Sequence, residues 1–153
     1  MGRYRRVTNS SQETVNMGIE LGKILPQGVV LLLFGDYGSG KTEFVRGIVQ
    51  GYLGDISAQE VASPSFSLLH VYGNGTRRIC HYDFYRIDTI GEGQFSLFQD
   101  TEEEDVLCIE WPENIMLPRF RETIQVRIDA LTAAQREVSI DASPSILLKF
   151  LKE

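Results

Sequence analysis

Hydrophobic positions in the first third of the chain change period twice. Residues 15, 18, 19, 22 and 25 recur at helical spacing after Ser10 and Glu13, whose three-residue separation is that of a capping box, so the pattern predicts a helix beginning near Ser11. The continuous apolar run "VVLLLF" at 29–34 follows and predicts a strand buried on both faces. A second helix is expected over residues 41–52.

The rest of the chain reads as short strands joined by turns. Asn74-Gly75 between two apolar stretches is a strong hairpin signal, and two later segments alternate apolar and polar positions, which suggests a second antiparallel pair. Residues 88–105 are polar, acidic and glycine-containing and are expected to form a loop with at most one helical turn, and residues 145–151 suggest a short terminal helix. The expected strands are residues 66–72, 77–87, 106–110, 122–129 and 136–142.

The segment "GDYGSGKT" at 35–42 fits the phosphate-loop pattern G-x-x-x-x-G-K-[ST] without a mismatch. Glycines allow the tight turn that aims successive N–H groups at phosphate oxygens, and the following helix N-terminus adds partial positive charge. Lys41 is expected to reach the β- and γ-phosphates, and Thr42 to offer its hydroxyl to Mg²⁺. Residues predicted to bind nucleotide in this loop are Asp36, Tyr37, Gly38, Ser39, Gly40, Lys41 and Thr42.

An acidic residue at the end of a neighbouring strand usually completes such a site by holding Mg²⁺. Asp83 and Glu110 both end apolar runs, and each could instead be an ordinary polar residue at a strand end. Ser65 or Ser67 could sense the γ-phosphate or lie in a plain turn after Pro64. Arg86 could reach phosphate, bind a partner or form a surface ion pair. His70 and His81 are interpreted as ordinary strand residues.

Composition limits the function classes. The chain has 153 residues, enough for one domain, and a formal net charge of −6, which argues against a protein that holds nucleic acid by broad phosphate neutralisation. The local clusters Arg3, Arg5, Arg6 and Arg77, Arg78 are interpreted as surface charge. Two widely spaced cysteines form neither a zinc pattern nor a disulfide framework, and no apolar run could span a bilayer. A cytoplasmic protein with buried thiols is expected.

The nucleotide is predicted to be ATP. The base-reading N-K-x-D pattern of GTPases does not occur in the sequence, and "DTIG" at 88–91 is only a weak match to a GTPase switch. A small-molecule kinase would need an acceptor site and an arginine-bearing lid, whereas the remaining chain offers hairpins and a short acidic loop. ATP therefore serves hydrolysis or a conformational state.

Four motifs in this order resemble the TsaE family, formerly YjeE: small bacterial ATPases needed for threonylcarbamoyl modification of adenosine 37 in tRNAs that read ANN codons. The motifs are "GDYGSGKTEFVRGI", "SPSFSLL", "HYDFYRID" and "IEWPE", and the resemblance covers about residues 10–136. Ser39 and Ser65 stand where the family more often has Ala and Thr. The segment after Arg86 departs from the acidic helix usual in the family, which bears on the partner surface more than on the ATP site.

The resemblance implies an α/β fold: a single P-loop ATPase domain over residues 1–153, with a central, mostly parallel sheet, antiparallel hairpins and flanking helices. It implies that Thr42 and Glu110 hold Mg²⁺, that Asp83 is the acid of the catalytic step, and that the segment around Ser11 lines the base of ATP. The implied partners are the threonylcarbamoyl transferase subunit and its inactive paralogue, with tRNA contacted indirectly. The expected activity is a weak, partner-stimulated ATPase that resets this complex; the alternatives are a nucleotide-dependent switch without useful hydrolysis and a small P-loop kinase.

Overall fold

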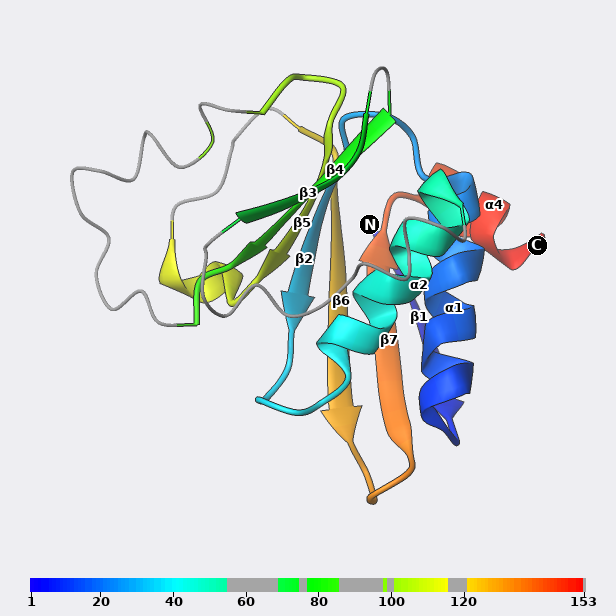
Figure 1. The fold of residues 1–153 in the computed structure, drawn as a ribbon. Coiled ribbons are helices and arrows are strands. Elements are labelled where there is room, and N and C mark those ends of the chain that lie inside the picture. The colour runs from blue at the N-terminus through cyan, green and yellow to red at the C-terminus, as the bar shows by residue number, and fades with distance from the viewer. Residues whose placement is uncertain (55–68, 75–76, 86–97, 99–100, 116–120, 153) are drawn as a thin grey trace.

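The computed structural model describes residues 1–54, 69–74, 77–85, 98, 101–115 and 121–152. This part of the chain forms a seven-stranded sheet with helices packed on it (Figure 1). The helices are α1 (Ser11–Ile24), α2 (Lys41–Leu53) and α4 (Pro144–Leu151), and a 3₁₀ turn spans Pro112–Asn114. The strands are β1 (Gly2–Thr8), β2 (Val30–Phe34), β3 (Leu69–Asn74), β4 (Arg77–Asp83), β5 (Val106–Glu110), β6 (Thr123–Ala130) and β7 (Arg136–Ala142).

Strand β2 lies in the middle of the sheet, whose order is β1-β7-β6-β2-β5-β4-β3. It runs parallel to β5 and to β6, and β4 runs parallel to β5. The pairs β3–β4, β6–β7 and β1–β7 are antiparallel. The predicted α/β fold with two hairpins and flanking helices is confirmed. The sheet was predicted to be mostly parallel but is evenly mixed, with three parallel and three antiparallel pairings, because the edge strand β1 adds an antiparallel pairing to those of the two hairpins.

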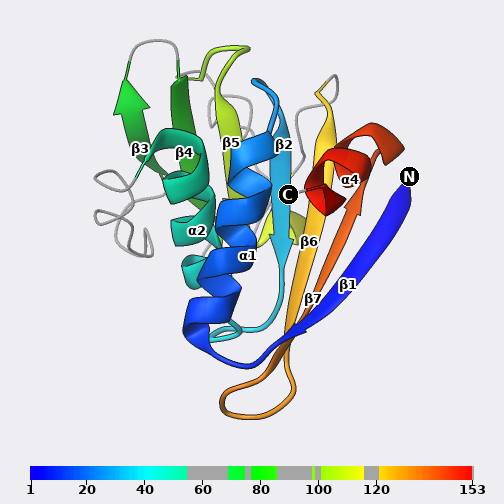
Figure 2. The ribbon, with the colours of Figure 1, turned by 90° about the vertical axis from the view of Figure 1, so that its right-hand side faces the viewer.

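The helices cover one face of the sheet (Figure 2). Because successive side chains of a strand point to opposite faces, Leu31 and Leu33 of β2 pack under the helices, whereas Val30 and Leu32 belong to a second apolar cluster on the other face. Both faces of β2 are therefore buried, as its uninterrupted apolar run predicts. A central strand that is buried on both faces thus leads directly into the phosphate loop.

Helices α1 and α2 approach each other through glycines. A Cβ added at Gly47 would lie 2.1 Å from the carbonyl oxygen of Val15, and one added at Gly18 would lie 2.4 Å from that of Phe44. One turn further on, Gly22 and Gly51 repeat the arrangement. The order of these contacts shows that the two helices run parallel, and Figure 1 shows both beginning at the same end of the molecule. We call these four residues the glycine seam.

The start of α1 is fixed as the capping pattern predicts. The Ser10 hydroxyl oxygen accepts a hydrogen bond from the backbone N–H of Glu13 at 3.1 Å, and Thr8 bonds to Thr14 through their buried hydroxyls at 2.8 Å. Strand β1 precedes it at the sheet edge, and its arginines form ion pairs: Arg3 with Asp141 and Arg6 with Glu20. None of the helices in the described ranges is long and apolar enough to cross a membrane.

Both cysteines are buried, as expected. Burial raises the pKa of Cys80 to about 12 and raises the pKa of Cys108 as well. The thiols therefore stay protonated at neutral pH and behave as small core side chains.

Candidate nucleotide site

The phosphate loop connects the end of β2 to the start of α2, the context that its motif requires. Gly35, Gly38 and Gly40 all have positive φ, at 147°, 78° and 110°. A Cβ at Gly35 would lie 2.4 Å from the carbonyl oxygen of Ile128, so the β6 backbone leaves no room for a side chain there. Inside the loop, the Ser39 N–H donates to the Asp36 carbonyl at 3.0 Å. The glycines thus serve the turn that the sequence predicts.

Lys41 is the first residue of α2, and its ammonium lies within the loop. Its Nζ donates to the Gly35 carbonyl oxygen at 2.6 Å and stands 4.1 Å from the centroid of the Trp111 ring. Burial lowers the pKa of Lys41, while the negative charges of Glu110 and Asp83 oppose that shift. The contact with Trp111 is a cation–π interaction, whose strength grows as water is excluded.

Asp83 and Glu110 end the adjacent parallel strands β4 and β5 and face each other in the strand register. The sheet therefore brings together the two acids that the sequence places at the ends of separate apolar runs. Glu110 is 3% exposed, whereas Asp83 is half-buried. Asp83 Oδ1 accepts a hydrogen bond from the Tyr85 N–H at 3.0 Å, which fixes the orientation of this carboxyl.

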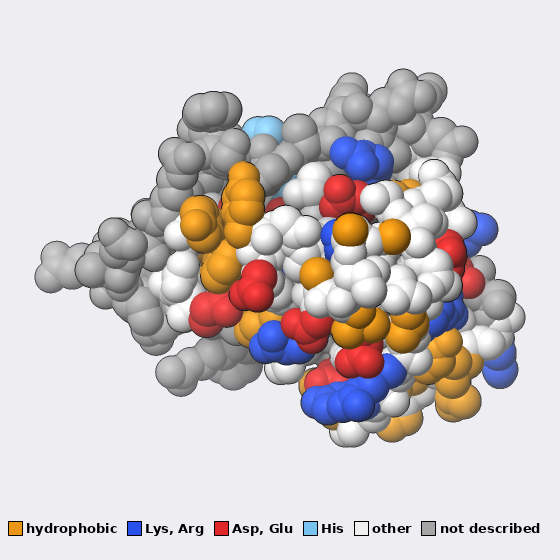
Figure 3. Space-filling view, turned by 90° about the horizontal axis from the view of Figure 1, so that it is seen from below, with side chains coloured by type: hydrophobic (Ala, Val, Ile, Leu, Met, Phe, Trp, Pro, Cys, Tyr) orange, Lys and Arg blue, Asp and Glu red, His pale blue; other side chains and the backbone are white. Residues whose placement is uncertain are grey.

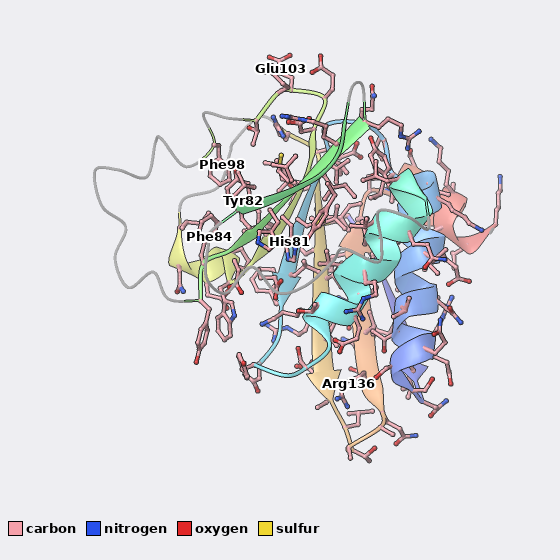
Figure 4. All side chains as sticks on the ribbon, in the orientation of Figure 1. His81, Tyr82, Phe84, Phe98, Glu103 and Arg136 are labelled. Carbon is pink, nitrogen blue, oxygen red and sulfur yellow. The ribbon has the colours of Figure 1, made fainter. Side chains whose placement is uncertain are left out.

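His81 lies beside Glu110, although its sequence context gave no sign of it. Its Nε2 is 2.5 Å from Glu110 Oε2, and its ring is fully buried (Figure 4). On the other side of the ring, Nδ1 lies 3.5 Å from the hydroxyl of Tyr72. Only the pairing of β4 with β5 reveals this contact, because His81 and Glu110 are 29 positions apart.

The residues present suit Mg²⁺. Among the described residues there is no group of three or more His, Cys, Asp or Glu side chains that could enclose a metal ion. Mg²⁺ does not require such a cage: it keeps several waters and binds through one or two carboxylates together with substrate phosphates. Glu110 and Asp83 supply carboxylates at the same edge of the sheet as the phosphate loop, and Thr42 follows Lys41 on α2.

Aromatic side chains line the same edge of the sheet. Trp111 has the left-handed φ of 59°, which is strained for a bulky residue. Its ring lies 4.9 Å from that of Tyr85, which in turn lies 5.7 Å from that of Tyr37 (centroid distances). Tyr37 is 82% exposed. Figure 3 views the molecule from this end and shows hydrophobic side chains at the surface beside acidic ones.

A small pocket of about 50 Å³ lies between the loop, the start of α1 and the start of β7. Ser11, at the start of α1, lies there together with the loop glycines Gly38 and Gly40. The pocket also includes Arg136, which the sequence analysis did not select. The complete lining is Ser11, Thr14, Gly38, Gly40, Glu43, Ala133, Ala134 and Arg136.

The remaining sequence candidates fall elsewhere. Ser65, Ser67 and Arg86 lie outside the described residues, as do most of residues 88–105. His70 lies on β3, with its ring centroid 6.3 Å from that of Tyr72.

Strand β2, the glycine-rich loop and helix α2, with acids at the ends of neighbouring strands, define a protein of the P-loop nucleotide-binding class. The model of the family "Threonylcarbamoyl adenosine biosynthesis protein TsaE" matches residues 8–138. The chain therefore belongs to the TsaE family, as its four motifs predict.

Individual relatives agree with this assignment. The chain is 32% identical to the tRNA threonylcarbamoyladenosine biosynthesis protein TsaE of Rickettsia felis, over 95% of this chain and 85% of that protein. It is 34% identical to the protein of the same name from Treponema pallidum, over 89% of this chain and 98% of that protein. The crystal structure of Bacillus subtilis YdiB is similar in fold, with a TM-score of 0.72 and 24% sequence identity over 99% of this chain and 95% of that one.

Proposed function

We propose that this chain, as a single domain, is a Mg²⁺-dependent ATPase that acts in the biosynthesis of N6-threonylcarbamoyladenosine at position 37 of tRNA. Membership of the TsaE family supports the pathway. The observation that carries the ATPase assignment is the pairing of Asp83 with Glu110 at the ends of adjacent strands, next to a phosphate loop whose Lys41 feels both charges. A site that only bound phosphate would not need two neighbouring carboxylates.

Each residue has a distinct part in the proposed reaction. Lys41 transfers its ammonium from the Gly35 carbonyl to the phosphates, because a charged phosphate oxygen is a stronger acceptor than a carbonyl. Glu110 and Thr42 would hold Mg²⁺, which would supply positive charge to offset that of the phosphates. Asp83 orients the attacking water through the carboxyl that the Tyr85 N–H fixes. The pocket at Ser11 receives the nucleotide base.

We assign an accessory role in which the protein resets the threonylcarbamoyl transferase complex. The partners are the transferase subunit and its inactive paralogue, and these carry the contact with tRNA. The net charge of −6 supports indirect contact, and so do the ion pairs of Arg3, Arg6 and Arg78 with carboxylates. Isolated protein should hydrolyse ATP slowly, because an arginine supplied by a partner can raise the rate of phosphoryl transfer about 10³–10⁵-fold.

Calorimetry and phosphate release together test this proposal. Wild-type protein should bind ATP in preference to GTP with Mg²⁺ present, and Lys41→Ala should abolish binding while leaving thermal unfolding near the wild-type value. Steady-state phosphate release should rise when the transferase heterodimer is added. Unchanged ATP affinity in Lys41→Ala would reject the phosphate site. ATP binding with no hydrolysis, alone or with the heterodimer, would favour the nucleotide switch.

A further inference from the structure

We propose that Arg136 is a positioning residue that sets the geometry of the phosphate loop by holding the carbonyl of Ser39. This inference rests on the proposed function, because it assumes that the loop binds phosphate. Arg136 begins β7 and lies beside the loop that follows β2 (Figure 4). Its Nε donates to the carbonyl oxygen of Ser39 at 2.8 Å, across 97 positions of sequence.

The rest of the guanidinium is held by the turn that precedes β7. Nη1 donates to the carbonyl oxygens of Thr132 at 2.9 Å and Gln135 at 3.0 Å, with a longer contact to that of Ala133 at 3.4 Å. The turn is itself tied to the segment before α1, because the Gln135 amide donates to the Asn9 side chain at 2.8 Å. The Arg136 head group therefore presents Nε to Ser39 from a fixed position.

Ser39 has few other attachments to its surroundings. Its hydroxyl is buried, and within the described residues it has no hydrogen-bond partner. Its N–H bonds only within the loop, to the carbonyl of Asp36. The Ser39 carbonyl is thus the group through which the loop is attached to β7.

The orientation of that carbonyl fixes the next N–H. The Ser39–Gly40 peptide is trans and planar, so the Ser39 carbonyl and the Gly40 N–H point in opposite directions. Because the Ser39 carbonyl faces Arg136, the Gly40 N–H points away from Arg136, and a phosphate held by this N–H would lie on that side of the loop. Gly40 has φ of 110° and no side chain to hold this peptide plane, so Arg136 holds it in place. An N–H already aimed at the phosphate costs less to order when nucleotide binds.

Two substitutions of similar length separate this role from simple support of the turn. Arg136→Gln keeps a nitrogen donor the same number of bonds from the backbone as Nε, whereas Arg136→Met keeps the volume but has no donor. Both lose the Nη1 bonds to the turn, so any effect they share reports on the turn. The difference between them reports on the Ser39 carbonyl. Arg5→Met, at an exposed position on β1, is the matched control.

The measurement is Mg-ATP affinity by calorimetry, with thermal unfolding of each variant in parallel. Arg136→Met should weaken ATP binding about ten- to a hundredfold, the effect of losing a hydrogen bond from a charged group. Arg136→Gln should stay within about threefold of wild type because its donor remains. Arg5→Met should match wild type. Equal affinities for the Gln and Met variants would overturn the proposal, and so would a wild-type affinity in Arg136→Met.

Two further outcomes can be distinguished: a variant that does not fold, and a failure of the proposed phosphate site. If Arg136→Met does not fold, Arg136→Gln decides alone: a loss of about tenfold or more in the folded Gln variant would assign the effect to the charge or to the turn and overturn the proposal. If Lys41→Ala also bound ATP normally, the phosphate site itself would be rejected. Loss of binding in Lys41→Ala with no effect in Arg136→Met would reject only the role of Arg136.

Discussion

The imidazole of His81 and the carboxylate of Glu110 form a buried pair, with Nε2 at 2.5 Å from Oε2. A Glu110 carboxylate that holds Mg²⁺ is ionised and only accepts hydrogen bonds, so in that state the Nε2–H of His81 donates to it. This bond occupies one carboxylate oxygen and fixes the side-chain orientation. Outer partners of this kind hold metal-binding side chains in place, and their loss typically costs about 10–100-fold in metal affinity.

Substitution of His81 should therefore weaken Mg²⁺ binding at the site and raise the Mg²⁺ concentration that ATP binding requires. His81→Asn removes the donor that reaches Glu110, whereas His81→Gln places an amide nitrogen near the position of Nε2. We expect the Asn variant to need about 10–100-fold more Mg²⁺ than wild type for half-maximal ATP binding. The increase in the Gln variant should be much smaller than in the Asn variant. A magnesium titration at fixed nucleotide, followed by calorimetry, measures this. Equal Mg²⁺ requirements in the wild type and the Asn variant would contradict it.

The two acids at the strand ends should separate by function. Glu110→Gln should weaken nucleotide binding only when Mg²⁺ is present, because it removes a charge from the metal. Asp83→Asn should bind Mg-ATP normally and lower phosphate release about 10²–10⁴-fold, the usual size of acid–base assistance. Binding isotherms with and without Mg²⁺, alongside phosphate release, distinguish the two. Equal binding losses would place both residues at the metal.

The glycine seam should not tolerate a methyl group. Gly47→Ala would put Cβ within 2.1 Å of the Val15 carbonyl, so the helices must separate. We expect a loss of about 1–3 kcal/mol in the free energy of unfolding, the usual cost of overpacking, or more. Urea denaturation measures it, with Gln50→Ala on the same helix as control. Unchanged stability in Gly47→Ala would mean that the two helices are not held at this distance.

The Asp105 carboxylate should make stability depend on acid pH. Arg78 bonds to it through Nη2–Oδ2 at 2.6 Å and Nε–Oδ1 at 3.0 Å, and the Glu102 N–H adds a bond at 2.8 Å. These bonds, that of Arg78 first, lower the pKa of Asp105 in the folded protein. The folded pKa lies below the unfolded value of about 3.9, so the stabilisation is complete above that value and is lost as pH falls through the folded pKa.

Asp105→Asn tests this dependence. At pH 7 the variant should be about 1.5–3 kcal/mol less stable than wild type, the range for hydrogen bonds to charged groups. The difference should shrink as the pH is lowered below about 4, because protonation removes the same charge from the wild-type protein. Urea denaturation between pH 7 and pH 3 measures both curves. A difference that stays constant over this range would show that the charge of Asp105 is not the source of its effect.

Local sequence patterns predicted the elements well where the pattern was regular, as in a continuous apolar run or a strict alternation of apolar and polar residues. The run 29–34, the glycine-rich loop and the alternating segments of β6 and β7 appear where expected. Strand β1 was not predicted, because its three arginines were interpreted as surface charge. Only its pairing with β7 shows its place in the sheet. The spacing of Gly18 and Gly22 predicted that they share a helix with the apolar residues around them. The close approach to α2 that these glycines allow is visible only in the structure.

The contacts of His81 and Arg136 could not be predicted from the sequence. His81 meets Glu110 through strand pairing, and Arg136 meets Ser39 because the order of the sheet brings the start of β7 beside the phosphate loop. Both contacts join residues far apart in the chain. No local pattern marks either residue, since a histidine on a strand and an arginine after a polar turn are common.

The glycine seam also restricts how the length of this protein can vary. Each residue advances a helix by about 100°. If the seam glycines kept their contacts, one residue inserted between Ser11 and Gly18 would therefore rotate the start of α1 away from its present neighbours. An insertion between Lys41 and Gly47 would do the same to the start of α2. Ser11 and the loop glycines would then no longer line one pocket. The first two turns of each helix therefore have a fixed length.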